Sequence, residues 1–256
     1  MTILRSATAL LGAVVIAACG DTAVQDITGP LPSARIKFFN FGVSAPGVNF
    51  YANDVKITAI TSATGVESTT GTASGLAASG GFYTGIAPGQ YTVTGKIAAT
   101  VDKDLVVATV PVTIADGKFY SVYLSGIYNT TAKTVEGFVV EDPVEATIDF
   151  AMATVRFVHG ISNADALTLY ARNTVTTTEV AVGSSIVYKA AGAFTKIPAG
   201  VYDLGARYVG NTTNAFARTG VSFLAGRVYT VGARGDITVT STTLATRPQL
   251  DNTANR

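Results

Sequence analysis

Apolar and polar residues alternate along most of this chain with a period of two. Ile36 and Phe38 alternate with Arg35 and Lys37, and the same period recurs over residues 91–94 in threonines, tyrosine and valine. Such alternation is typical of a β-strand with one buried and one solvated face. β-branched and aromatic residues dominate these segments, which also favours strands. We expect no amphipathic helix after residue 34.

One set of these strand patterns occurs twice. Residues 36–40 (Ile-Lys-Phe-Phe-Asn) match residues 155–159 (Val-Arg-Phe-Val-His), and the alignment continues without a gap for a further dozen residues. The length between matches changes only between apolar segments, so the strands keep their order while the loops vary. The later matches pair residues 84–91 with 195–202 and residues 117–126 with 226–235. The sequence therefore predicts a tandem repeat of one β-domain.

Turn residues separate the predicted strands at matching places in the two copies. Pro88-Gly89 corresponds to Ala199-Gly200, where glycine accommodates a positive φ before the next strand. Short strands at this spacing imply an antiparallel sandwich of about seven strands per copy. The expected fold class is all-β, with two tandem antiparallel Ig-like or transthyretin-like β-sandwich domains after a lipoprotein signal peptide.

The N-terminus has the features of a processed lipid anchor. Arg5 supplies a positive charge, residues 7–18 form an apolar run shorter than the roughly 20 residues that span a bilayer, and Cys19 follows. Small residues before the cysteine resemble the bacterial lipobox, in which the cysteine is acylated after cleavage, and two or more acyl chains give stable membrane anchoring. The alternative is a plain secretory signal cut elsewhere. Gly20 in place of aspartate favours the outer membrane, with its periplasmic or surface orientation left open.

These features divide the chain into six segments. Acidic residues and Pro143 mark a linker between the copies. Its carboxylates are the oxygen ligands that calcium takes, but their spacing matches no calcium-loop motif, so a solvated linker is expected and calcium stays the open alternative. The expected segments are 1–18, signal peptide; 19–33, lipidated cysteine and flexible tether; 34–140, first sandwich; 141–152, acidic linker; 153–245, second sandwich; 246–256, polar C-terminal tail.

Composition excludes several classes of function. Cys19 is the sole cysteine, so its acylation leaves no thiol for a disulfide, a nucleophile or a metal site. Charged residues are 14% of the chain and the net charge is +1, which argues against nucleic-acid binding. The sequence contains neither G-x-G-x-x-G nor a Walker loop, so no nucleotide cofactor is expected. Tryptophan is absent, so a glycan-binding surface would have to rely on tyrosine.

The matched motifs resemble the bacterial family known as domain of unknown function 4397. The second copy carries the pattern in residues 155–159, in 197–202 (Ile-Pro-Ala-Gly-Val-Tyr) and in 225–231 (Ala-Gly-Arg-Val-Tyr-Thr-Val). The first copy keeps a weaker version. The resemblance implies an extracytoplasmic, often lipid-anchored β-domain without an agreed activity. The family often has an aspartate where this chain has Asn49 and Thr168.

Candidate chemistry centres on His159, the only histidine. Asp165 lies six residues later across a predicted turn, but no G-x-S-x-G motif is present, and Asn40 occupies the matching position of the first copy. We expect a histidine that is hydrogen-bonded to the turn and not catalytic. We also expect no metal site, no cofactor and no catalytic residue.

One long loop, residues 62–81, is rich in Ser, Thr, Ala and Gly and is either a solvated loop or a contact surface.

The function expected from the sequence is a non-enzymatic lipid-anchored envelope protein, a tandem β-sandwich binding or structural module outside the cytoplasm. Its expected partners are the membrane, through Cys19, and an envelope protein or glycan. The alternatives are an envelope hydrolase and a small-ligand carrier with a site near His159. The residues of the candidate contact loop are Ser62, Thr64, Glu67, Thr70 and Ser74.

Overall fold

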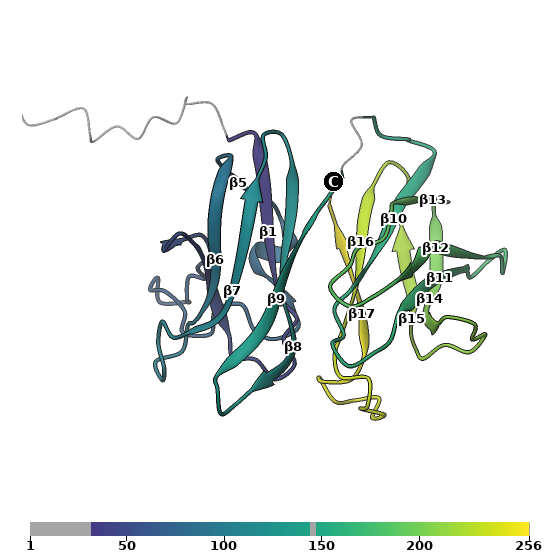
Figure 1. Ribbon diagram of the computed structural model, residues 1–256. Helices are drawn as coiled ribbons and strands as arrows, with labels where there is room; N and C mark the ends of the chain where they lie inside the picture. The colour runs from purple at the N-terminus through teal and green to yellow at the C-terminus, as the bar shows by residue number, and fades with distance from the viewer. Residues whose placement is uncertain (1–31, 144–146, 256) are drawn as a thin grey trace, which may run out of the picture. The chain divides into compact units, whose positions relative to one another are not determined.

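The computed structural model describes residues 32–143 and 147–255, which consist of β-strands and loops with one 3-10 turn, η1 (Ala78–Gly81). In Figure 1 the colour of each strand follows its position along the chain, from purple at the N-terminus to yellow at the C-terminus. Within these ranges no helix has the length and apolar character that crossing a membrane requires. Pro32–Arg256 forms one compact unit. Cys19, the predicted signal peptide and most of the predicted tether lie outside the described residues.

The N-terminal sandwich (residues 34–142) has two sheets. One has the strand order β4-β1-β8-β9, with β5 also pairing with β1, and the other has the order β3-β2-β6-β7. The strands are β1 (Ala34–Asn40), β2 (Val48–Ala52), β3 (Val55–Lys56), β4 (Leu76–Ala77), β5 (Thr84–Ile86), β6 (Gly89–Ile97), β7 (Val106–Ile114), β8 (Phe119–Asn129) and β9 (Thr134–Glu141).

The C-terminal sandwich (residues 152–255) repeats this arrangement. One sheet has the order β13-β10-β16-β17 and the other has the order β12-β11-β14-β15. The strands are β10 (Met152–His159), β11 (Leu167–Asn173), β12 (Glu179–Ile186), β13 (Thr195–Pro198), β14 (Gly200–Tyr208), β15 (Phe216–Phe223), β16 (Val228–Arg234) and β17 (Gln249–Ala254).

The predicted all-β sandwich class is confirmed, with one feature that the alternation did not indicate. Most neighbouring strands are antiparallel, but β1 pairs with β8 and β10 pairs with β16 in parallel register. Between the two strands of each parallel pair, the chain passes through the opposite sheet. A period of two shows which face a residue occupies but carries no information on strand direction, so this pairing could not be read from the sequence.

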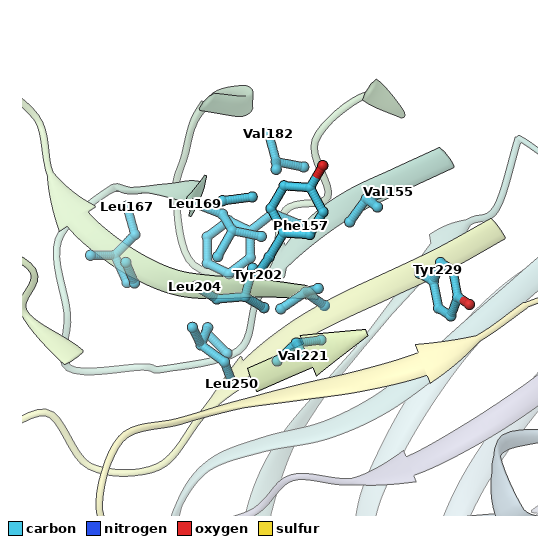
Figure 2. Close-up of a cluster of buried hydrophobic side chains, with 14 of the residues drawn as sticks. Val155, Phe157, Leu167, Leu169, Val182, Tyr202, Leu204, Val221, Tyr229 and Leu250 are labelled. Carbon is cyan, nitrogen blue, oxygen red and sulfur yellow. The ribbon is translucent and has the colours of Figure 1, made fainter. Parts of the chain in front are cut away.

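Each sandwich has a hydrophobic core between its own two sheets. In the N-terminal sandwich, Ile36 and Phe38 from one sheet pack with Phe50 from the other. In the C-terminal sandwich, Val155 and Phe157 occupy the matching positions in a cluster contributed by both sheets. Figure 2 shows this second cluster, in which Leu204 and Leu250 come from opposite sheets.

The structure corrects the prediction of a polar C-terminal tail, because residues 249–254 form strand β17. Residues 249–254 pair with β16 along its length, and Leu250 is only 2% exposed in the C-terminal core. The sequence pattern was misleading because Leu250 is the single large apolar residue of this strand. The other end of the predicted linker also changes, since Glu141 is the last residue of β9.

Replacing Leu250 by alanine tests the role of β17. We expect a loss of about 2–4 kcal/mol in the free energy of unfolding, because the substitution leaves a cavity in the core. Leu244, which is 54% exposed, provides the control, and its replacement by alanine should change the free energy by less than about 0.5 kcal/mol. Urea unfolding of both variants measures the difference. Equal, small effects would show that β17 does not contribute to the core.

Candidate functional site

Polar side chains of four strands are buried on the faces that point away from the two sandwich cores. Lys37 on β1 and Arg156 on β10 are 1% and 0% exposed, and Ser121 on β8 and Thr230 on β16 are also buried. The alternation had indicated solvated positions for Lys37. That interpretation is wrong because these faces meet each other, so β1, β8, β10 and β16 are covered on both sides.

Arg156 of the C-terminal sandwich forms an ion pair with Asp142 of the N-terminal sandwich. Its Nη1 also donates to the carbonyl of Glu141 at 3.0 Å, and its Nε donates to Thr230 Oγ1 at 3.1 Å. Burial lowers the pKa of Arg156, but a guanidinium starts so high that it keeps its proton. The charge therefore persists in the interior and needs the carboxylate beside it.

Asp142 is fully enclosed by donors. Its carboxylate accepts hydrogen bonds from Ser121 Oγ at 2.6 Å and from the Tyr83 hydroxyl at 2.5 Å, in addition to Arg156. Burial raises the pKa of the Tyr83 phenol, so this hydroxyl remains a donor. The expectation that the acidic residues form a solvated linker is thus wrong for Asp142. Its oxygens are bound within the protein and are not free for calcium.

Lys37 makes the reciprocal contact. Its Nζ donates to Oδ1 of Asn255 at 2.5 Å and lies 4.6 Å from the centre of the Tyr83 ring. Asn255 Nδ2 in turn donates to Thr230 Oγ1 at 2.8 Å. Burial, assisted by the nearby charge of Arg156, lowers the pKa of Lys37 to about 7. The amine therefore loses its proton near neutral pH. At 1% exposure it is closed to solvent, unlike a nucleophile that meets a substrate.

An aromatic cluster continues the contact between the sandwiches. Phe39, Phe41, Tyr123 and Phe138 of the N-terminal sandwich pack with Val158 of the C-terminal one. The rings of Phe39 and Tyr123 stack with centroids 4.5 Å apart. Nearby, Ser125 Oγ donates to the carbonyl of Gly160 at 2.6 Å. These contacts combine apolar burial with directional bonds between the two sandwiches.

His159 is fully buried at the end of β10, and both ring nitrogens have partners in the following turn. Nδ1 accepts from the backbone N–H of Ile161 at 3.2 Å, so Nε2 carries the proton and donates to the backbone carbonyl of Asp165 at 3.0 Å. Burial lowers the pKa of His159, which favours the neutral ring. The prediction that His159 bonds the turn is confirmed, although through the main chain of Asp165.

Asn40 performs the same task in the N-terminal sandwich. Its Nδ2 donates to the carbonyl of Pro46, six residues later, at 3.0 Å, as His159 does to Asp165. It also donates to the carbonyl of Thr72 at 2.9 Å. An amide that cannot exchange protons near neutral pH thus replaces the imidazole, which indicates a structural function for both side chains.

The residues of the candidate contact loop do not form one site. Ser62, Thr64 and Glu67 belong to a small hairpin held by the Thr61–Glu67 bridge, and Glu67 pairs with Lys56 at 2.7 Å. Thr70 is exposed beyond it. Ser74 is separate, since its hydroxyl donates to the carbonyl of Gly42. The end of the loop is packed, because β4 pairs with β1 and Ala78 reaches the core.

A groove of about 850 Å³ lies between β15 and β17 of the C-terminal sandwich. Phe216, Ile237 and Leu250 contribute apolar surface, and Arg218 and Arg247 contribute charge. His159 is not among its lining residues. The site near His159 that the small-ligand alternative requires therefore does not coincide with this groove.

The sequence of the C-terminal sandwich matches the model of a known family. Residues 153–256 match the family model Domain of unknown function (DUF4397). The DUF4397 match includes β17, which agrees with the assignment of this strand to the sandwich and not to a tail. No curated protein matches the chain. The relation of the N-terminal sandwich to DUF4397, expected from the repeat, stays a prediction.

Sequence reasoning missed the buried charge cluster, although one signal was available. Lys37 and Arg156 are cationic residues at matching positions of the two aligned motifs, between apolar neighbours. Two cations at one position of a repeated strand indicate a shared environment. Their partners Asp142 and Asn255 had no such signal, since both follow strand ends that the sequence placed in a linker and a tail.

Replacing His159 by asparagine tests its structural function. We expect a loss of about 1 kcal/mol or less in the free energy of unfolding, because the amide can donate to the same turn, as Asn40 does. Chemical denaturation measures the effect. Loss of a measured activity at an unchanged melting temperature would instead indicate a histidine-dependent site.

Lys37 should make stability depend on pH. Its pKa is about 7 in the folded state and near the ordinary value of 10.5 when unfolded, so above pH 7 the unfolded chain binds more protons. The free energy of unfolding should therefore rise by about 1–2 kcal/mol from neutral pH to about pH 9, and Lys37 should add no slope at acidic pH. Urea titrations of the wild type and Lys37→Met measure this. If stability changed with pH in the same way in the wild type and in Lys37→Met, the lowered pKa of Lys37 would be contradicted.

Proposed function

We propose that the protein is a non-enzymatic, lipid-anchored envelope protein of the bacterial outer membrane. Its tandem β-sandwiches serve as a binding or structural module outside the cytoplasm, and its membrane attachment is the acylated Cys19. The observation that carries the proposal is the use of the buried ionisable side chains. Arg156 and Asp142 form an ion pair between the sandwiches, and Lys37 binds Asn255 of the other sandwich. His159 bonds its own turn, so each of these side chains has a structural function.

The surface left for partners lies elsewhere on the molecule. The exposed hairpin around Thr64 presents hydroxyl groups, and the outward strand positions of β6 and β7 carry threonines such as Thr92 and Thr113. Hydroxyl-rich surfaces of this kind suit an envelope protein or glycan partner that is held by hydrogen bonds. An envelope hydrolase would need an accessible acid–base pair, and the fully buried ring of His159 does not provide one.

Replacing Cys19 by serine tests the anchor. We expect the variant to leave the membrane fraction or to remain unprocessed, because serine cannot form the thioether to diacylglycerol. Fractionation of cells and metabolic labelling with a radioactive fatty acid measure the change. The His159→Asn variant is the control and should stay in the membrane. Unchanged detergent-phase partitioning of Cys19→Ser would refute lipid anchoring.

A further inference from the structure

The contact between the sandwiches is built from equivalent positions. In the N-terminal sandwich, Ile36 is in register with Tyr120 and Tyr120 with Glu141. In the C-terminal sandwich, Val155, Tyr229 and Ala254 are paired in the same way. The next residues are therefore equivalent as well. The equivalent pairs are Lys37 and Arg156, Ser121 and Thr230, and Asp142 and Asn255.

The hydrogen bonds at these positions repeat. The N–H of Asp142 donates to the carbonyl of Phe119 at 2.7 Å, and the N–H of Asn255 donates to that of Val228 at 2.7 Å. Across the interface, Arg156 binds Asp142 while Lys37 binds Asn255. Each sandwich thus offers its cation to the same position of the other. Such reciprocity is the pattern of an isologous interface between two copies of one subunit.

The two sandwiches differ in the size of their side chains at equivalent positions where their apolar surfaces meet. Phe41 and Tyr123 of the N-terminal sandwich correspond to Gly160 and Gly232 of the C-terminal one. A Cβ atom on Gly232 would lie 2.7 Å from the Phe41 ring, which is closer than such contacts allow. The aromatic ring therefore occupies space that the glycine leaves free. Large residues on one face are matched by small residues on the other.

The charges also differ between the halves. Asp142 gives a carboxylate to Arg156, whereas Asn255 gives only an amide to Lys37. A pair of two C-terminal sandwiches would set each buried guanidinium against an amide, without a counter-charge. A pair of two N-terminal sandwiches would set Phe41 and Tyr123 against equally large residues. Only the mixed pair satisfies both requirements.

We propose that this face is a homotypic docking surface: its partner is another sandwich of the same type, and large-for-small matching selects the C-terminal sandwich as that partner. The surface consists of Lys37, Phe41, Ser121, Tyr123 and Asp142. The proposal does not depend on lipid anchoring or on an envelope partner. It predicts that the two sandwiches stay bound when the chain between them is cut.

The test begins with the full chain carrying a specific protease site in place of residues 144–146. The folded protein is cut and then passed through a size-exclusion column at low micromolar concentration, with native mass spectrometry of the peak. We expect one complex with one N-terminal and one C-terminal piece. Separation of the pieces, or pairing of like with like, would overturn the proposal.

Two variants of the cleavable chain test the matching of sizes. Gly232→Leu should weaken the association of the pieces by about tenfold or more, because its side chain meets Phe41. Phe41→Ala combined with Gly232→Leu should restore most of it. Val201→Leu, on the outer strand β14, is the control and should have no effect. If the double variant binds no better than Gly232→Leu, or if Gly232→Leu binds as the wild type, large-for-small matching is wrong.

Should Gly232→Leu fail to fold, Phe41→Ala alone provides the same information. It removes the large partner without adding atoms, and it should also weaken the association of the pieces. Unchanged association would show that the apolar contact does not hold the sandwiches together.

Discussion

The burial of two sheets on both faces is the constraint on which the rest of the structure depends. β1 and β8 pack against their own sandwich core on one side and against β10 and β16 on the other. A side chain on either face must then find its partner within the protein, since water is excluded. Polar residues at the outward positions of these strands must therefore form hydrogen bonds or ion pairs with one another. Lys37 and Arg156 accordingly bind Asn255 and Asp142 of the opposite sandwich, and at the rim Lys189 pairs with Glu136 at 2.6 Å.

The buried charges show how such a constraint is met. In the cluster around Asp142, two cations meet one carboxylate, and Lys37, the cation without a carboxylate, is the one that can lose its proton. Lys37 does so near neutral pH, whereas a guanidinium at the same place could not. Replacement of a buried ion pair by apolar residues is often neutral for stability, whereas loss of one partner is strongly destabilising, so Arg156 can be buried here only where Asp142 is also present. At equivalent positions, each buried basic group thus has a partner that suits its charge. Lysine, which can be neutral, faces an amide, and arginine, which stays charged, faces a carboxylate.

Much of the fold followed from the sequence, because alternation and turn residues are local signals. They located most strands, and the aligned motifs indicated that both copies share a strand order. The direction of β1 relative to β8 was not predictable, since the pattern does not encode direction. β17 was missed because four of its six residues are polar and its one large apolar residue, Leu250, gave no period. The same reason hid Asp142 and Asn255, whose polarity resembled that of solvated linkers.

His159 and Asn40 show how the site differs from a catalytic one. The two side chains differ in chemistry, yet each donates to the carbonyl six residues later and closes the same turn. A catalytic imidazole would depend on its proton exchange, whereas a turn needs only a donor of the right reach. The ionisable side chains of the turns and of the contact between the sandwiches are thus buried and held by hydrogen bonds within the protein. Exposed hydroxyl groups lie instead on the outward positions of β6 and β7 and on the hairpin around Thr64.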